Sequence, residues 1–551
     1  MTHDHDWWRT AVIYQVYPRS FADRDGDGTG DLPGIAARLD HVAALGADAI
    51  WLSPFYPSPQ ADGGYDVADY RDVDPVYGTL DDADALLERA HELDLRVIVD
   101  LVPNHCSDQH ELFQRALAAP PGSPERGMFH FRDGRGPGGD EPPNDWESMF
   151  QGPAWTRVAE ADGRPGQWYL HLFAPEQPDW NWDDPRVHAE FETTLRFWLD
   201  RGVDGFRVDV CDAIVKAPGL PDWPHATHGV IEPVDGVMPP MWDQEGIHDV
   251  FRAWRRVLDE YEGQRILCAE AWLPPERAAR IVRPDEMHQA FNFAYLSLPW
   301  DADAIRATVD TSLAANHAVG APTTWVLSNH DVMRHASRFG YDGPVELESG
   351  VGADDPQPDR DLGLRRARAA TLLMLGLPGS SYLYQGEELG LPEVTTLPDD
   401  VRQDPVWERS GHTTRGRDGC RVPIPWTAEE PAFGFAFGAA ADTWLPQPDD
   451  FGTFAVDVQH DDPRSTLAMY RAALVVRREH DLGAGELHWL EDLTVPGAGV
   501  LAWSNGSVAV VANTGAEPVT LPDGDVLVAS VPDAVRDGML QRDAAVWVRL
   551  R

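Results

Sequence analysis

Short apolar runs rich in β-branched residues alternate along most of the chain with longer segments whose apolar positions recur every three or four residues. The short runs are typical of buried strands and the longer segments of amphipathic helices. Strands are predicted at 12–18, 49–54, 96–103, 205–210, 265–272, 291–296, 323–331 and 380–388, and helices at 32–46, 81–93, 188–202 and 247–261. Eight strands that alternate with helices predict an α/β fold, the (β/α)8 TIM barrel.

Two segments interrupt this alternation. The segment 105–186, after the third predicted strand, is rich in Gly, Pro and Trp and is too long for a loop, so it predicts a small inserted domain. From residue 484 the chain consists of short strand-like runs, which predict a C-terminal all-β sandwich domain. The expected division is a catalytic barrel of 1–104 and 187–483, an inserted domain of 105–186 and a β-sandwich of 484–551.

The charge balance changes the range of partners to expect. The chain has 45 Lys and Arg against 91 Asp and Glu, a formal net charge of −46. A protein this acidic repels phosphate backbones and anionic lipid headgroups, so neither nucleic acid nor membrane is an expected partner. No apolar run approaches the roughly 20 residues of a membrane helix, and the N-terminal MTHDHDWWRT has no feature of a secretory signal.

The four cysteines, at 106, 211, 268 and 420, have no CxxC spacing. This spacing argues against a disulfide framework or a zinc site and favours buried thiols in the reducing cytoplasm. The sequence leaves monomer and homodimer open.

Charged side chains gather at the ends of the predicted strands, where barrel enzymes build their active sites. Two carboxyl groups about 5–5.5 Å apart hydrolyse a glycoside with retention of configuration. Arg207 and Asp209 are two residues apart on one strand and share a face, so the guanidinium can keep Asp209 ionised as a nucleophile. Glu270 is then the acid/base. The group at the strand ends comprises Asp100, His105, Arg207, Asp209, Glu270, His330 and Asp331.

Several motifs together resemble one family. DLVPNH (100–105), GFRVDV (205–210), AEAW (269–272) and SNHD (328–331) resemble the four signature regions of the α-amylase superfamily, glycoside hydrolase family 13, and QPDWNW (177–182) resembles a fifth. The opening segment 7–35, YQGEELG (384–390) and GRDGCRVPIPW (416–426) resemble its α-glucosidase/oligo-1,6-glucosidase branch.

The resemblance implies a role for each matching residue. Asp209 matches the nucleophile, Glu270 the acid/base and Asp331 the third carboxylate, which stabilises the transition state. Sugar-binding positions are matched by Tyr65, His105, Phe173, Arg207 and His330. Asp62 and Arg417 match the pair that closes the pocket around a non-reducing glucose, with Arg421 as a rival for Arg417. The sequence departs from the family at Cys106 and at Cys211-Asp212.

A Gly-rich acidic loop follows the first predicted strand. It places oxygen ligands at alternate positions, Asp23, Asp25, Asp27, Thr29 and Asp31, and hard oxygens suit a hard cation. It is not an EF-hand, because Gly34 occupies the twelfth position, where a Glu is required. The resemblance implies a structural Ca²⁺ or Mg²⁺ site here, away from the chemistry.

These observations lead us to expect a retaining exo-acting α-glucosidase that acts on short gluco-oligosaccharides of the maltose type, and on sucrose. One alternative is a transglucosylase or isomerase of the same superfamily, of the trehalose synthase or sucrose isomerase type. A second is an inactive relative associated with a transporter. Val210 resembles α-1,6-acting members but its Cys-Asp neighbours do not, so the linkage stays open, with α-1,4 slightly favoured.

Overall fold

The centre of the molecule is a closed parallel barrel. The structure is a computed structural model that describes residues 6–160, 162–225, 229–343, 345–438 and 442–551. Eight strands pair in the order β10-β11-β1-β2-β3-β7-β8-β9, and a bridge from Phe291 to Thr324 joins the two edges. The strands are β1 (Val12–Val16), β2 (Ala49–Leu52), β3 (Arg96–Leu101), β7 (Gly205–Val208), β8 (Ile266–Ala269), β9 (Gln289–Ala290), β10 (Thr324–Val326) and β11 (Ser380–Tyr384). The predicted (β/α)8 barrel is confirmed.

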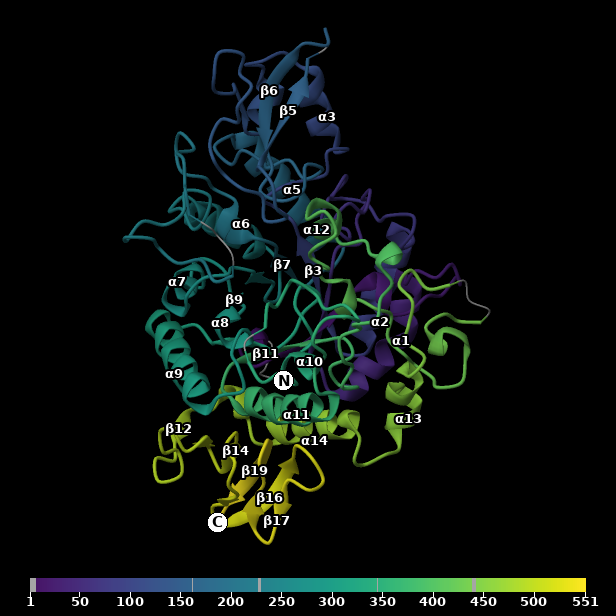
Figure 1. The fold of residues 1–551 in the computed structure, drawn as a ribbon, viewed down its shortest axis with the longest axis vertical. Coiled ribbons are helices and arrows are strands. Elements are labelled where there is room, and N and C mark those ends of the chain that lie inside the picture. The colour runs from purple at the N-terminus through teal and green to yellow at the C-terminus, as the bar shows by residue number, and fades with distance from the viewer. Residues whose placement is uncertain (1–5, 161, 226–228, 344, 439–441) are drawn as a thin grey trace.

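Helices follow the strands in turn and surround the barrel (Figure 1). The sequence specifies where they begin: the Asp31 carboxylate accepts the Gly34 N–H at the start of α1, and Thr79 and Asp82 form a capping box on α2. The ring consists of α1 (Leu32–Leu45), α2 (Leu80–Glu92), α5 (Pro185–Asp200), α6 (Ile247–Leu258), α7 (Pro275–Ile281), α9 (Ala302–Val319), α11 (Arg360–Gly376) and α14 (Thr466–Glu479).

The sixth strand differs from the prediction. A strand was expected over 291–296, but β9 ends at Ala290 and Phe293–Leu296 forms a short helix, α8. The side chain of Asn292 accepts a hydrogen bond from the Tyr295 N–H at 3.0 Å and so caps this turn. Because an Asn cap favours a helical turn over continued extension, the apolar run divides after the bridge at Phe291.

Side chains alternate between the barrel interior and the helical layer, as the period of two along a strand requires. On β2, Ala49 and Trp51 belong to the interior cluster, whereas Ile50 and Leu52 pack among the helices. The interior cluster also contains Ile13, Ile98, Cys268, Val326 and Tyr382 from five other strands. This packed interior supports the strand ends above it.

The inserted segment forms a small antiparallel sheet at one end of the long axis (Figure 1). Its strands β4 (Phe131–Arg132), β5 (Trp155–Ala159) and β6 (Pro165–Leu170) pair in the order β4-β6-β5, beside α3 (Glu111–Ala118) and α4 (Pro124–Gly127). A bridge between His105 and Asp179 brings the first residue of the insertion next to a residue near its end, just after β3. The insertion therefore borders the carboxyl ends of the barrel strands.

The C-terminal region is antiparallel and lies at the opposite end (Figure 1). One sheet pairs β12 (Leu487–Trp489), β13 (Val500–Asn505), β14 (Val508–Asn513), β19 (Ala544–Leu550) and β16 (Gly524–Ala529). A second contains β15 (Val519–Thr520), β18 (Met539–Leu540) and β17 (Val535–Arg536). The first sheet docks on α11, where Trp547 Nε1 donates to the Leu372 carbonyl at 2.9 Å.

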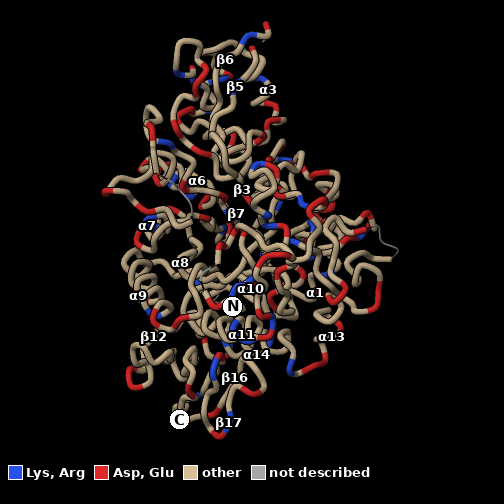
Figure 2. The backbone as a smooth tube through the Cα atoms, viewed as in Figure 1, with Lys and Arg blue, Asp and Glu red and all other residues tan. Residues whose placement is uncertain are grey.

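Acidic residues are distributed along the backbone and outnumber the basic ones (Figure 2). All four cysteines are buried free thiols, as expected. Among the residues that the structure describes, no helix has the length and apolar character of a membrane span.

Trp547→Ala should destabilise the protein strongly, because Trp547 is fully buried where the C-terminal sheet meets α11. Removing a buried Trp side chain costs about 3–5 kcal/mol of the free energy of unfolding. Urea denaturation monitored by circular dichroism should show a much lower midpoint. Val526→Ala is the control, since Val526 on β16 is 46% exposed and its loss should cost less than about 0.5 kcal/mol. Equal midpoints for the two variants would contradict the docking.

Candidate active site

A cavity of about 630 Å³ opens where the barrel strands end. Asp209 follows β7, Glu270 follows β8 and Asp331 lies in the connection after β10, and all three line this cavity. His105, from the connection after β3, lines it too. The structure thus brings together carboxyl groups from distant parts of the chain, at the position where barrel enzymes act.

Arg207 holds the carboxyl groups together from behind the lining. Its Nη1 lies 2.8 Å from Asp100 Oδ1 and 2.7 Å from Asp209 Oδ1, and its Nη2 contacts Glu270 Oε2. Register explains the first contact, since Asp100 on β3 pairs directly with Arg207 on β7. The second follows from the spacing of two residues along the chain. One guanidinium therefore fixes both predicted catalytic carboxyl groups.

The electrostatics favour protonation of part of this cluster. Burial, with the neighbouring charges of Glu270 and Asp100, raises the pKa of Asp209 well above its ordinary value, although Arg207 lowers it. Burial likewise raises the pKa of Asp100 to about 7, against the opposite effect of Arg207. Three carboxyl groups thus share one cation. Such crowding allows one carboxyl to keep a proton while its neighbour ionises.

The residue after Asp209 has a strained backbone. Val210 has φ 41° and ψ 43°, a left-handed conformation that β-branched residues rarely adopt. This conformation lets the Val210 N–H donate to Glu270 Oε2 at 3.1 Å. Strain of this kind persists where the surrounding structure requires it, and it is concentrated at functional sites. Here it links the two predicted catalytic residues.

The side chains of Tyr65 and His330 lie next to the carboxyl groups of the site. The rings are stacked, with centroids 5.2 Å apart and planes at 7°, and the Tyr65 hydroxyl donates to Asp100 Oδ2 at 3.1 Å. Burial lowers the pKa of His330 well below its ordinary value, so the imidazole is neutral. Gln15 Nε2 lies 2.7 Å from His330 Nδ1, and since an amide nitrogen can only donate, the ring proton is on Nε2, which faces Asp331 Oδ2 at 3.3 Å.

Arg417 closes one end of the cavity. Its Nη2 lies 2.7 Å from Asp62 Oδ1, and its other nitrogens contact Asp331 Oδ1 at 3.0 Å and Asp404 Oδ2 at 2.6 Å. Arg421 does not contact Asp62; it lies behind Asp331, 3.0 Å from Oδ1, and donates to the His330 carbonyl. Of the two arginines left open by the sequence, Arg417 therefore pairs with Asp62.

Asp331 is kept ionised by its surroundings. Burial by itself would raise its pKa, but the charges of Arg417 and Arg421 lower the pKa below its ordinary value. The carboxylate is therefore available at neutral pH to accept hydrogen bonds from a bound sugar or to stabilise positive charge.

Several lining or supporting residues were not predicted. Asp404 pairs with Arg417, and no motif marks it. Gln177 Nε2 donates to Asp62 Oδ2 at 3.1 Å and lies 3.0 Å from His105 Nε2; the motif QPDWNW contains it and could have indicated it. The rings of the predicted Phe173 and of His105 have centroids 5.1 Å apart and are tilted at 52°, and the ring centroid of the unpredicted Phe150 lies 5.1 Å from the Arg417 guanidinium. Aromatic rings thus border the closed end.

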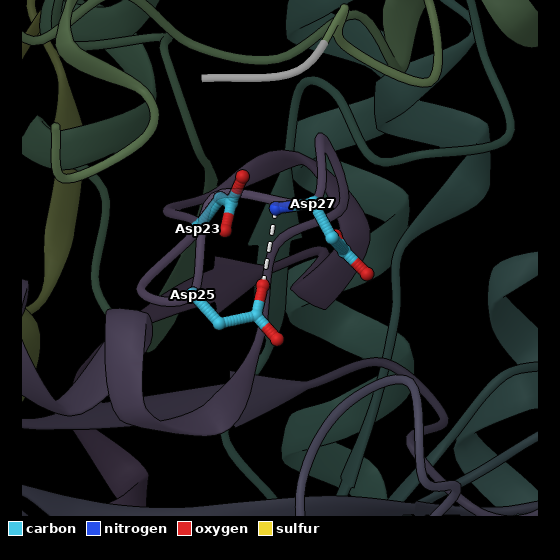
Figure 3. A group of neighbouring side chains, drawn as sticks. All are labelled: Asp23, Asp25 and Asp27. Carbon is cyan, nitrogen blue, oxygen red and sulfur yellow. Dashed lines mark hydrogen bonds between the residues drawn. The ribbon is translucent and has the colours of Figure 1, made fainter. Parts of the chain in front are cut away.

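The acidic loop after β1 fits a hard cation. The carboxyl groups of Asp23, Asp25 and Asp27 lie within 4.8 Å of one another (Figure 3). Burial, and the charges of Asp27 and Asp25, raise the pKa of Asp23, and among the described residues none of the three forms an ion pair with Lys or Arg. Asp31 is not one of these three carboxylates, and its oxygens accept the N–H groups of Arg24, Asp25 and Gly34. The oxygens of Asp23 likewise accept the Gly26 and Gly28 N–H groups. Thr29 donates its own N–H to Asp27.

The sequence and the fold are similar to known proteins. The family model "Alpha amylase, catalytic domain" matches residues 15–484. A probable alpha-glucosidase of Rhizobium meliloti (strain 1021) is 37% identical over 509 residues, which are 89% of this chain and 86% of the relative. An oligo-1,6-glucosidase of Parageobacillus thermoglucosidasius is 34% identical over 512 residues, 86% of this chain and 84% of the relative.

Solved structures agree in fold. The crystal structure of an alpha-glucosyl transfer enzyme, XgtA, superposes with a TM-score of 0.83 at 35% identity and covers 99% of each chain. A trehalulose synthase, MutB, superposes with a TM-score of 0.82 at 28% identity, covering 99% of this chain and 100% of the other. The similar structures thus include an alpha-glucosyl transfer enzyme and a trehalulose synthase, beside relatives named as glucosidases.

We propose that the loop of Asp23, Asp25 and Asp27 holds a structural Ca²⁺ or Mg²⁺, and that removing the ion lowers stability more than turnover. A site filled at 100 times its dissociation constant contributes about 2.7 kcal/mol. A chelator should therefore lower the melting temperature by a few degrees, and Asp25→Asn should remove most of that response. An unchanged melting temperature, with no metal found by elemental analysis, would refute the site.

Proposed function

The chain belongs to the α-amylase family of glycoside hydrolases, and on this premise we propose that it is a retaining, exo-acting α-glucosidase. It releases glucose from the non-reducing end of short α-gluco-oligosaccharides of the maltose type, and from sucrose. The observation that carries the proposal is the ion pair between Asp62 and Arg417, which bounds the cavity beside the three carboxyl groups.

The reactive form has the proton of the carboxyl cluster on Glu270, and Asp209 is ionised beside Arg207. In the first step Asp209 attacks the anomeric carbon and the bond to the leaving oxygen breaks. Glu270 gives its proton to that oxygen, so the aglycone leaves as a neutral alcohol and a glucosyl ester forms on Asp209. The guanidinium of Arg207 contacts both carboxyl groups through its two terminal nitrogens, which supports the short separation that a retaining pair needs.

In the second step water attacks the anomeric carbon of the ester. Glu270, now ionised, takes the proton from the water, and the carbon–oxygen bond to Asp209 breaks, which restores both groups and releases α-glucose. Positive charge develops at the ring in both steps. Asp331, whose pKa is lowered by two arginines despite its burial, supplies an ionised carboxylate close to that charge.

The closed end of the cavity favours a terminal glucose. Asp62 is 4% exposed, and its second oxygen accepts a hydrogen bond from Gln177. Hydroxyl groups of a terminal glucose can exchange hydrogen bonds with Asp62 and Arg417, whereas a glucose inside a longer chain would need an exit through this pair. The closed end formed by Asp62 and Arg417 therefore supports release of terminal glucose from short substrates over cleavage inside starch.

A transglucosylase or isomerase remains the second candidate, because the fold is similar to that of an alpha-glucosyl transfer enzyme and of a trehalulose synthase. These reactions share the first step and differ in whether water or a sugar hydroxyl attacks the ester. The inactive, transporter-associated alternative is not supported, since all three carboxyl groups reach one cavity.

The buried free thiols fit a reducing compartment, so we place the enzyme in the cytoplasm.

Asp209→Ala should abolish hydrolysis of maltose, because the glucosyl ester cannot form, while the fold stays intact. Wild-type reactions followed by proton NMR should show α-glucose first. The far-ultraviolet circular dichroism spectrum and the melting temperature provide the control for folding. Turnover near the wild-type rate in the variant, or β-glucose as the first product, would contradict the double-displacement mechanism.

Asp62→Ala should lower kcat/KM for maltose by at least about 100-fold, since losing one partner of a buried charged pair costs about 2–5 kcal/mol. Asp69→Ala, an exposed carboxylate in the same loop, serves as the control and should change little. With maltoheptaose, the wild type should yield glucose and the chain one unit shorter. Maltotriose and maltotetraose as first products would show that Asp62 and Arg417 do not close the cavity.

A further inference from the structure

The cavity lining is strongly acidic. Eight carboxyl side chains reach it, whereas Arg417 is the one Lys or Arg among the described lining residues. The carboxyl groups are those of Asp62, Asp209, Asp212, Glu270, Asp331, Glu346, Glu348 and Asp404. His105 adds no positive charge, because burial lowers its pKa to about 3.

The single cation is already committed. Arg417 forms ion pairs with Asp62, Asp331 and Asp404, at the end that the proposed function assigns to the terminal glucose. Asp209 and Glu270 share Arg207 behind the lining. Three carboxyl groups of the lining, Asp212, Glu346 and Glu348, form no ion pair with any residue that the structure describes.

Asp212 is built into the wall. It lies three residues after Asp209 and is 2% exposed, yet its Oδ2 has no hydrogen-bond partner among the described residues. Its backbone carbonyl accepts from the Asp243 N–H, which fixes it beside Trp242. Trp242 is also buried on the lining, and its indole N–H is likewise without a described partner.

Glu346 and Glu348 come from the connection after β10. Both are exposed, and both reach the cavity lining. Backbone hydrogen bonds hold their segment on two sides: the Met333 N–H donates to Leu347 O at 2.8 Å, and the Gly416 N–H donates to Ser349 O at 3.1 Å. The two carboxylates are thus presented to the cavity by a segment anchored close to Asp331 and Arg417.

Two indole rings complete this part of the cavity. Trp272, two residues after Glu270, lines it and is stacked on Phe293 with centroids 4.1 Å apart. Glu270 protonates the leaving oxygen, so residues near it face the departing group. Aromatic faces with unpaired carboxylates attract ammonium groups. We call Asp212, Trp242, Trp272, Glu346 and Glu348 the aglycone wall.

We propose that the aglycone wall selects glucosides and acceptors whose aglycone carries a primary ammonium group, and disfavours those that carry a carboxylate or a phosphate. The proposal rests on the proposed function, because glucose must occupy the end closed by Asp62 and Arg417 for the aglycone to meet this wall. An ammonium group supplies the positive charge that the wall lacks, whereas an anion adds to the existing repulsion.

The pKa of Asp212 reflects its burial among other carboxyl groups. Burial, and then the charges of Asp243 and Glu270, raise the pKa of Asp212 well above its ordinary value. Asp212 therefore holds a proton more readily than a free carboxyl group does, and a neighbouring ammonium group would favour its ionised form.

The test uses three α-glucosides that differ in the charge of one group on the aglycone: 4-(aminomethyl)phenyl, 4-(hydroxymethyl)phenyl and 4-carboxyphenyl. Glucose is common to all three, so only the aglycone reports on the wall. At neutral pH and about 0.05 M salt, kcat/KM should fall in that order, with at least about a tenfold difference between ammonium and carboxylate. About 0.5 M salt should reduce the difference.

Glu348→Gln should lower the ammonium-to-carboxylate ratio of kcat/KM by at least about threefold. Glu346→Gln provides a second variant should the first fail to fold. Asp342→Asn removes an exposed carboxylate of the same segment that does not reach the lining, and should leave the ratio unchanged.

Equal rates for the three substrates, a preference for the carboxylate, or a ratio that neither glutamine variant moves would overturn the aglycone wall. Failure to cleave any of the three would instead refute the proposed α-glucosidase function.

Discussion

The buried guanidinium of Arg207 is the contact on which the rest of the site depends. It lies 2.8 Å from Asp100 and 2.7 Å from Asp209 and also contacts Glu270, and it is 1% exposed. Three carboxylates buried without a cation would repel one another and would be costly to desolvate. With the arginine present, they can be held close enough for two of them to act on one glycosidic bond.

A second arginine organises the other side of the cavity by the same principle. Arg417 joins Asp62, Asp331 and Asp404, and Asp62 precedes it by 355 residues. Each arginine contacts three carboxyl groups, and the cavity lining contains more carboxyl groups than cationic groups. The excess negative charge of the chain therefore reaches into the site itself, where it can discriminate between substrates by charge.

Much of the fold was predictable because each local signal agreed with the barrel. Seven of the eight predicted strands and all four named helices appear close to their expected positions. The exception shows the limit: the run at 291–296 is apolar enough for a strand, but the Asn292 cap begins a helix within it. Periodicity cannot separate a short buried strand from a buried helical turn, so the capping residue decided the outcome.

The sequence by itself determined the fold class and which candidate catalytic residues are present, since motif spacing and strand periodicity are local properties. Arg207 and Asp209 could be paired from sequence because two residues on one strand share a face. The choice of Arg417 over Arg421, the support from Asp404 and the unpaired Oδ2 of Asp212 required the tertiary structure. These contacts join segments far apart along the chain, and only the closed barrel and its connecting loops bring them within hydrogen-bonding distance.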